Sequence, residues 1–381
     1  MTQLPQRRVD FGVERHLQIR QRRDEGFKGG QRVAAAVEHG LGEHIRAPVA
    51  SGLGLACVWR YACGVHLPQL VIVTPALADA NNGNWQTAHR WSHLLSGAYR
   101  VRLTAQWSDH DDALMIALHA RRSAHSIVAW RERHPGRPLV LVLTGTDLYR
   151  DIASDADAHR SLELADRLVV LNALGARALP AHLQDKAHVV LQSCSARVAV
   201  GKSPNHLRAL MVGHLRSEKD PQTYFEAARL LAHDANIHFD HIGAALDADL
   251  GQQAQALHAA CPNYRWLGPL SHDATRRRIQ RAHVLVHPSR MEGGAHVVIE
   301  AVRSGTPVLA SHIDGNVGLL GARYSGYFAV GNAAELAAKL VDLHLHQGLL
   351  AQLAQQAQAC SVQFDAESEA RSLKSLLAPL I

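Results

Sequence analysis

The sequence predicts an α/β protein with two successive domains, each built on a parallel sheet. Through residues 69–381, apolar runs of three to six residues alternate with longer stretches of helical periodicity. Continuous apolar runs are typical of strands buried on both faces, and their alternation with helices indicates parallel sheets with right-handed crossovers. The alternation is interrupted at Gly201–His206 (GKSPNH), which we interpret as an interdomain linker. A chain of 381 residues is long enough to bury two ordinary cores.

The first domain is predicted to be Rossmann-like and to cover residues 69–200. We expect strands at Leu70–Thr74, Val101–Leu103, Met115–His119, Leu139–Leu143, Arg167–Leu171 and His188–Leu191. We expect helices from Gly83 to about Ser96, at Ser123–His134 and at Ala156–Ala165. Ligands of such sheets bind beyond the carboxyl ends of the strands, so the loops that follow the strands are the candidate sites.

The second domain, also Rossmann-like, is predicted to cover residues 201–365. We expect strands at Ala209–Gly213, Ile237–Ile242, Tyr264–Leu267, Val284–His287 and Pro307–Ala310. We expect helices at Pro221–His233, Asp247–Ala260, Asp273–Ala282, Ala333–Leu343 and Gly348–Gln358. A final segment, 366–381, is helical from Ala366 and is expected to pack back onto the first domain. Two domains of similar size imply a cleft between them, which is a frequent ligand site.

Residues 1–68 are predicted to be a poorly structured extension. They carry 10 Lys and Arg against 6 Asp and Glu, whereas the rest of the chain carries 30 against 28. The basic excess therefore lies mainly in the extension, which argues against a nucleic-acid-binding surface on the folded body. The apolar run Ala47–Val58 is too short to span a membrane and too far from the start for a signal peptide. We expect that translation of the natural protein starts near Val65, so that the extension is an artefact of the chosen start.

The cysteine and histidine patterns predict no metal site. The five cysteines, Cys57, Cys63, Cys194, Cys261 and Cys360, show neither a CxxC pair nor zinc spacing. We expect free thiols in a reducing cytoplasm and no metal cofactor.

The stretch Val284–Ser311 is the main candidate binding element. Two acids, Glu292 and Glu300, flank Gly293 and Gly294 at the predicted start of a helix. Free amides at a helix start bind phosphate, glycine permits close approach, and a carboxylate accepts hydrogen bonds from sugar hydroxyls. This pattern favours a sugar-nucleotide site over an ordinary strand–loop–helix unit with surface acids.

A cationic loop follows the first strand of the second domain. It contains His214, Arg216 and Lys219, with Pro221 at the first helical position. An arginine fork and a lysine ammonium suit a pyrophosphate, and they stabilise a departing nucleotide diphosphate without a metal. The alternative is a common surface cluster of charged residues.

The loop after the first strand combines amides with glycine. Asn81, Asn82, Gly83 and Asn84 precede a predicted helix and suit an anion or a sugar. The alternative is an asparagine-capped turn, although three asparagines exceed what capping requires.

Two further loops of the first domain carry polar residues at strand ends. His119, Arg121 and Arg122 follow one strand, and a cation at a helix start is unfavourable unless an anion binds there. Thr146 and Asp147 follow the next strand; they either line the cleft or cap a short helix.

Together these residues resemble family 4 glycosyltransferases of the GT-B fold, over about residues 69–381. The resemblance implies an acceptor domain followed by a nucleotide-sugar domain, with Lys219 and the amides of Gly293–Ala295 holding the diphosphate. It also implies that Glu292 faces the donor sugar and Glu300 holds the ribose. The family arginine position is occupied by His214, so either His214 or Arg216 binds the diphosphate; we expect Arg216.

The first domain departs from the family pattern at Arg121. Many members have a His-x-His motif, whose second histidine lies near the reacting sugar carbon; His119-Ala120-Arg121 replaces it. Arginine does not lose its proton at neutral pH, so it serves an anionic acceptor better than a hydroxyl that needs a base. We therefore expect Arg121, Arg216, Lys219 and Glu292 to be the catalytic residues.

Four stretches resemble one branch of this superfamily, the selenosugar synthases of selenoneine biosynthesis. They are ANNGNWQTAHRW, ALHARRSA, LTGTDLY and VGHLRSEKDP. This resemblance implies transfer of a sugar from UDP-N-acetylglucosamine or UDP-glucose to selenophosphate, with release of UDP and phosphate. It implies small-molecule substrates, no nucleic-acid partner and no membrane span.

Other functions fit the same fold. They are a conventional family 4 glycosyltransferase with a hydroxyl acceptor, a UDP-sugar epimerase and a non-catalytic nucleotide-binding module. An epimerase requires acid–base residues around the sugar C2, which Arg121 does not favour. The preferred sugar, the anomeric outcome and the oligomeric state stay open from the sequence.

Overall fold

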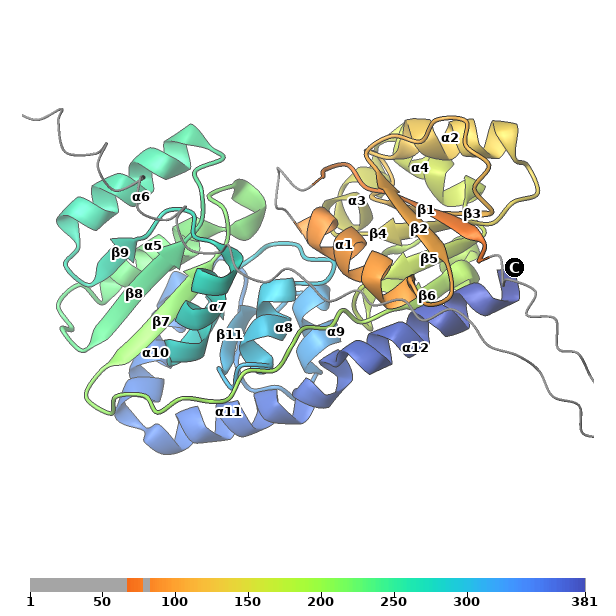
Figure 1. Cartoon of the computed structure of the whole chain (residues 1–381). Helices are drawn as coiled ribbons and strands as arrows, with labels where there is room; N and C mark the ends of the chain where they lie inside the picture. The colour runs from red at the N-terminus through yellow and green to blue at the C-terminus, as the bar shows by residue number, and fades with distance from the viewer. Residues whose placement is uncertain (1–66, 78–82, 381) are drawn as a thin grey trace, which may run out of the picture. The chain divides into compact units, whose positions relative to one another are not determined.

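The computed structural model describes residues 67–77 and 83–380. The predictions for the extension up to residue 66 and for Asn81 and Asn82 lie outside the described residues. The α/β class with two parallel sheets is confirmed, and Figure 1 shows helices packed around each sheet.

The first sheet has six parallel strands in the order β2-β1-β3-β4-β5-β6. The strands are β1 Gln69–Val73, β2 Arg100–Thr104, β3 Leu114–Leu118, β4 Leu139–Leu143, β5 Arg167–Val170 and β6 Ala187–Val189. The helices are α1 Gly83–Leu95, α2 Ala124–Arg133, α3 Thr146–Tyr149 and α4 Ala156–Leu164. Each predicted strand of this domain is present, with its ends within two residues of the expected ones.

Alternate residues of β1 face two separate hydrophobic clusters. Val71 and Val73 pack with Trp130 of α2, whereas Leu70 and Ile72 pack with Trp91 of α1. The second cluster also receives leucines from α12 (Ala366–Leu377), near the end of the chain. Figure 1 shows α12, in dark blue, beside this sheet.

The second sheet also has six parallel strands, in the order β12-β11-β10-β7-β8-β9. They are β7 Leu207–Val212, β8 Ile237–Ile242, β9 Tyr264–Trp266, β10 Val284–His287, β11 Val308–Ser311 and β12 Tyr327–Phe328. The helices are α5 Pro221–Leu230, α6 Ala248–Ala260, α7 His272–Arg281, α8 His296–Val302, α9 Asp314–Leu320, α10 Ala333–Leu345 and α11 Gln347–Cys360. Short 3-10 helices span Asp151–Ala153, Gly175–Ala178, Ala181–Lys186, Ser217–Lys219, Ser361–Phe364 and Ala378–Leu380.

The strand order places the candidate loops at the points where each sheet reverses its direction of winding. In the first sheet this point lies between β1 and β3, which are followed by the asparagine loop and by His119. In the second sheet it lies between β7 and β10, which are followed by His214 and by the segment up to Glu292. Open parallel sheets bind ligands at such points, beyond the carboxyl ends of the strands.

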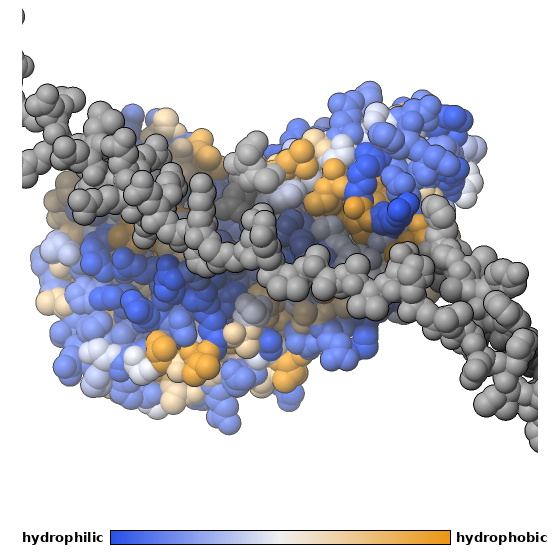
Figure 2. Space-filling model, viewed as in Figure 1, coloured by the Kyte–Doolittle hydropathy of each residue, from blue (hydrophilic) through white to orange (hydrophobic). Residues whose placement is uncertain are grey.

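No helix in the described ranges is long and apolar enough to cross a bilayer. On the face shown in Figure 2, hydrophobic residues lie in separate groups among hydrophilic ones.

Candidate functional site

Glu292 is held by two basic side chains at the carboxyl end of β10. Lys219 Nζ lies 2.5 Å from Glu292 Oε1, and His287 Nε2 lies 3.2 Å from the same oxygen. Burial alone would raise the pKa of Glu292, but Lys219 and His287 hold that pKa far below its usual range. No hydrogen bond or ion pair between described residues reaches Oε2. The carboxylate is therefore fixed through one oxygen and offers the other.

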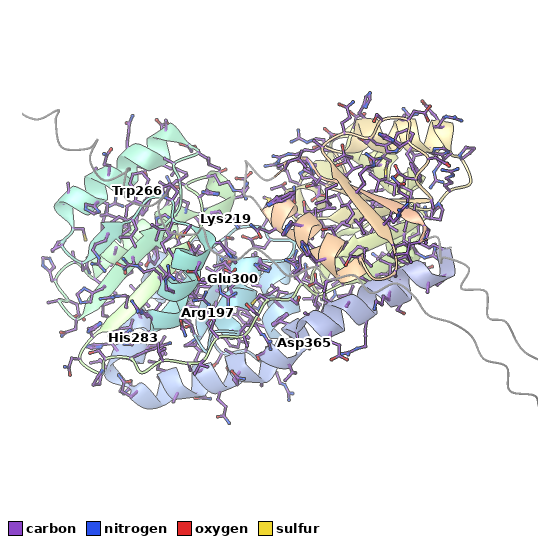
Figure 3. The ribbon with its side chains drawn as sticks, viewed as in Figure 1. Arg197, Lys219, Trp266, His283, Glu300 and Asp365 are labelled. Carbon is purple, nitrogen blue, oxygen red and sulfur yellow. The ribbon has the colours of Figure 1, made fainter. Side chains whose placement is uncertain are left out.

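Glu300 shows the same arrangement in α8. His272 Nε2 lies 2.6 Å from Oε1 and His296 Nδ1 lies 3.4 Å from it, with Arg276 Nη1 at 4.0 Å. Burial would raise the pKa of Glu300, but hydrogen bonds from the two histidines lower it to about 2. In the described chain, the contacts of this side chain all reach Oε1, so Oε2 can accept a ligand hydroxyl. Figure 3 labels Lys219 and Glu300 among the side chains of the second domain.

We expect the pKa of His272 to drop in Glu300→Gln. The hydrogen bond that His272 donates to Glu300 raises the pKa of His272 above 6.5, and burial opposes this only in part. The pair therefore stabilises the folded state fully between about pH 4.5 and 6.5. This contribution is lost as pH rises through the raised pKa of His272, and as pH falls toward the lowered pKa of Glu300. An NMR titration of the His272 ring in both proteins measures the shift. Equal titration curves would show that the hydrogen bond does not form in solution.

Close packing against loops of the first domain requires glycine at positions 293 and 294. A side chain on Gly293 would meet the carbonyl group of Thr144 at 2.5 Å, and one on Gly294 would meet Leu171 at 2.6 Å. The Asn172 side chain also donates to the Gly293 carbonyl oxygen at 2.7 Å. The sequence argument attributed these glycines to the approach of phosphate. In the structure, the loops after β4 and β5 already occupy the space that a side chain would need.

The amides of Gly293, Gly294 and Ala295 enter none of the hydrogen bonds formed between described residues. They precede the first residue of α8, His296, with Ala295 at the cap position. These N–H groups are therefore available to an anion placed beside Glu292.

Arg216 and His214 differ in their contacts. His214 Nδ1 accepts a hydrogen bond from the Ala244 amide at 3.1 Å, and burial followed by the charges of Arg216 and Lys219 lowers the pKa of His214. Arg216 has a buried Nε without a partner, and no ion pair of Arg216 occurs within the described residues. A buried guanidinium nitrogen without a hydrogen-bond partner is costly, so the site favours an anion there.

His119 has an unusual backbone conformation for a non-glycine residue, with φ at 73°. Its Nε2 lies 3.2 Å from Thr146 Oγ1, and burial lowers its pKa despite the nearby carboxylate of Asp147. Asp147 accepts hydrogen bonds from the amides of Thr144, Gly145 and Ala120 at 2.8–3.0 Å. Asp147 therefore fixes the turn that carries Thr146, and its role toward an acceptor stays a prediction.

Arg121 is oriented by a carboxylate. Its Nε lies 3.0 Å from Asp151 Oδ2, while Asp151 Oδ1 accepts from Arg150 Nε at 2.9 Å. Arg150 in turn donates to Glu218 of the second domain at 2.8 Å. The Arg121 side chain is 42% exposed, and its two Nη groups take part in no hydrogen bond between described residues. The guanidinium is thus held at one edge and open at the other.

Part of the predicted site lies outside the described residues, and the site also contains residues that were not predicted from the sequence. Gly83 and Asn84 are the first residues of α1, while the rest of the asparagine loop is outside the described residues. The missed residues are Arg90, Asn172, His272, His287, His296, Gly315 and Glu369. For Asn172 a signal was present, because it lies two residues beyond the end of β5, in a loop after a strand like the loops of the chosen residues.

An open pocket of about 530 Å³ lies next to the site. It is lined by Arg150 from the first domain and by residues of the second, including Glu218, Asp220, Arg290 and Met291. Neither Lys219 nor the two glutamates line it, so we locate the candidate site from the charged contacts rather than from this pocket. Among the described residues, no group of three or more His, Cys, Asp or Glu is arranged to hold a metal ion.

Comparison with known proteins identifies the second domain. Residues 193–359 match the family model "Glycosyl transferases group 1". No curated protein matches the sequence significantly.

Solved structures show the fold of the whole described chain. Anabaena Alr3699/HepE in complex with UDP and glucose has a TM-score of 0.65 at 17% identity, covering 83% of this chain and 100% of that one. Sucrose-phosphate synthase from Thermosynechococcus elongatus has a TM-score of 0.67 at 15% identity, covering 82% and 99%. A TarM mutant from S. aureus, in complex with UDP and other ligands, has a TM-score of 0.58 at 16% identity, covering 71% and 56%. The chain thus spans little more than half the length of TarM. These likenesses confirm the two-domain GT-B fold.

Proposed function

We propose that this chain, a glycosyltransferase by its group 1 domain and GT-B fold, transfers a sugar from a UDP-sugar to selenophosphate. UDP-glucose and UDP-N-acetylglucosamine are the candidate donors. Structures of the same fold are described as complexes with UDP and glucose, or with UDP, which supports a uridine nucleotide as the carrier. The proposal includes no metal cofactor.

The observation that carries the donor half is the charge arrangement around β7 and β10. Among the described residues Arg216 forms no ion pair and its buried Nε has no partner, while the nearby Lys219 Nζ contacts Glu292. A diphosphate supplies the missing negative charge, and two cations stabilise it as it departs. Glu292 and Glu300 each have one free oxygen, and we assign the first to the sugar and the second to the ribose.

The acceptor half rests on Arg121 and on the four stretches that resemble selenosugar synthases. A guanidinium fixed by Asp151 presents two Nη groups to an anion, which suits selenophosphate. Selenium, a soft nucleophile, needs no base when it attacks the sugar C1. A C–Se bond forms, the C1–O bond breaks, and its electron pair leaves on the β-phosphate oxygen of UDP. Water then attacks phosphorus, the Se–P bond breaks, and phosphate and the selenosugar are released.

The described cysteines Cys194, Cys261 and Cys360 are free thiols. Free thiols support a reducing compartment, and we place the reaction in the cytoplasm.

The direct test follows UDP release in the presence and absence of selenophosphate, with each UDP-sugar in turn. We expect UDP release to depend on selenophosphate, and we expect a product with the mass of the selenosugar to form. Both results should be the same with and without a metal chelator. Inorganic phosphate serves as the matched control anion. If UDP release requires a hydroxyl compound instead, selenophosphate is not the acceptor, while the assignment of a UDP-sugar as the donor still holds. A protein that binds neither UDP nor a UDP-sugar would overturn both.

Arg121→Ala is expected to raise KM for selenophosphate about tenfold or more, while KM for the donor changes little. A charge-assisted hydrogen bond contributes about 1.5–3 kcal/mol, which corresponds to this range. Steady-state kinetics with each substrate varied in turn measure the effect. Arg160→Ala, which removes an exposed cation of α4 in the same domain, is the matched control and should leave both constants unchanged. A larger effect on the donor constant would place Arg121 at the nucleotide instead.

A further inference from the structure

The carboxylate of Glu369 in α12 is buried and fully occupied. Glu369 is 1% exposed, and it accepts from Arg90 Nε at 2.8 Å, from Trp91 Nε1 at 2.6 Å and from the Ser193 amide at 2.8 Å. The Arg90 Nη2 group also donates to it, at 3.1 Å. Because the guanidinium is planar and is bound along one edge, these contacts fix the direction in which its remaining group, Nη1, points.

The remaining edge of Arg90 points to the candidate donor site. Arg90 Nη1 lies 3.3 Å from His296 Nε2, and the carbonyl oxygen of Ser193 lies 3.2 Å from the same nitrogen. The other ring nitrogen of His296, Nδ1, faces Glu300 Oε1 at 3.4 Å. With its proton on Nδ1, toward Glu300, the imidazole accepts from Arg90 at Nε2 and is therefore held from both sides.

This chain of contacts joins four segments that are distant in sequence: α1, the segment around Ser193, α8 and α12. Arg90 and Glu369 are 279 residues apart. Neither is near the free oxygen of Glu300, since His296 lies between them and that carboxylate. Replacing either residue would leave the binding groups in place and change only their orientation.

We propose that Glu369 and Arg90 are positioning residues for donor binding, which act through His296 on the orientation of Glu300. The inference rests on the proposed function, in which Glu300 holds the ribose of the donor. It assigns α12 a role beyond packing, because the docking of this helix on α1 sets the geometry of a residue in α8. Nucleotide affinity therefore depends on a carboxylate that does not touch the nucleotide.

The test measures UDP binding by calorimetry in the full-length protein and in three variants. Glu369→Gln keeps the shape of the side chain but cannot accept hydrogen bonds from all the donors that surround it. Arg90→Lys keeps the charge but cannot bridge Glu369 and His296 with one planar group. We expect each to weaken UDP binding about tenfold, with a smaller change in kcat than in the donor KM. Glu367→Gln is the matched control on the same helix, because its exposed side chain pairs with Arg371 on the surface, and it should bind UDP as the wild type does.

A double variant separates positioning from general loss of stability. In His296→Asn the ring that transmits the effect is absent, so adding Glu369→Gln should weaken UDP binding little further. Additive losses in the double variant would overturn the proposal, because they would show that Glu369 acts by another route. The ring ¹⁵N shifts of His296 should also change in Glu369→Gln and stay unchanged in Glu367→Gln.

The outcomes distinguish this inference from the proposed function. If the wild type does not bind UDP, the proposed function fails. If the wild type binds UDP and both Glu369→Gln and Arg90→Lys bind it equally well, only the positioning role fails. If Glu369→Gln does not fold, Arg90→Lys carries the test, since Arg90 is partly exposed and its replacement keeps a cation beside Glu369.

Discussion

Lys219→Met is expected to lower kcat for donor cleavage by about 10²–10³-fold. Under the proposed mechanism, Lys219 stabilises charge that develops on the departing diphosphate, and removal of one such group costs about this much. The substitution also leaves the Glu292 carboxylate, 11% exposed, without its closest cation. Breaking a buried ion pair costs about 3 kcal/mol or more, so a lower free energy of unfolding should accompany the loss of activity.

The double variant Lys219→Met, Glu292→Gln separates the two effects. Neutralising Glu292 removes the unpaired carboxylate, so we expect much of the lost stability to return while activity stays low. Denaturant unfolding and steady-state kinetics on all four proteins complete the cycle. Recovery of activity together with stability would mean that Lys219 only neutralises Glu292 and has no role toward the donor.

Gly315→Ala is expected to damage the site without altering any predicted ligand-binding residue. Gly315 lies in α9, and a side chain there would approach the carbonyl oxygen of Glu292 to 2.1 Å. The obstructing atom belongs to the backbone, so the Glu292 loop itself must move. Overpacking of this kind costs about 1–3 kcal/mol, and a shift of about 1 Å at a reacting group can lower activity about 10²-fold.

Thermal unfolding and kcat/KM measure the two effects of Gly315→Ala. Gly348→Ala, in the exposed start of α11 with no atom near the added carbon, is the matched control. The control should keep full activity and the same or a slightly higher melting temperature, because alanine favours the helix. Wild-type activity in Gly315→Ala would show that the position of the Glu292 loop does not matter for the reaction.

The regular elements were predictable because their signals are local. Apolar runs such as Leu139–Leu143 coincide with strands, and the helix expected from Ala366 begins at the first residue of α12. α9 and β12 were missed. α9 contains Gly315 and Asn316, which are poor helix formers, and it is stabilised by contacts that the sequence does not reveal. One such contact is the donation from the Asn316 side chain to the Ser311 carbonyl oxygen at 2.9 Å.

The glycines of the candidate site show where reasoning from the sequence reached its limit. Gly293 was correctly singled out, but its absent side chain makes room for the Thr144–Gly145 turn. Gly145 itself has φ at 135°, and a side chain there would meet the Gly293 amide at 2.8 Å. A motif identifies a position that needs glycine, whereas only the partner segment explains why.

The sequence by itself determined the α/β class, the strands other than β12, and the place of Glu292 and Glu300 in the loop and helix that follow β10. These follow from periodicity and spacing, which are properties of short segments. Only the tertiary structure decided which distant charges meet: Lys219 with Glu292, His272 with Glu300, and Arg90 with Glu369. Such pairs depend on crossovers and helix docking that bring residues together across tens to hundreds of positions, and no local pattern records which partner a buried charge will find.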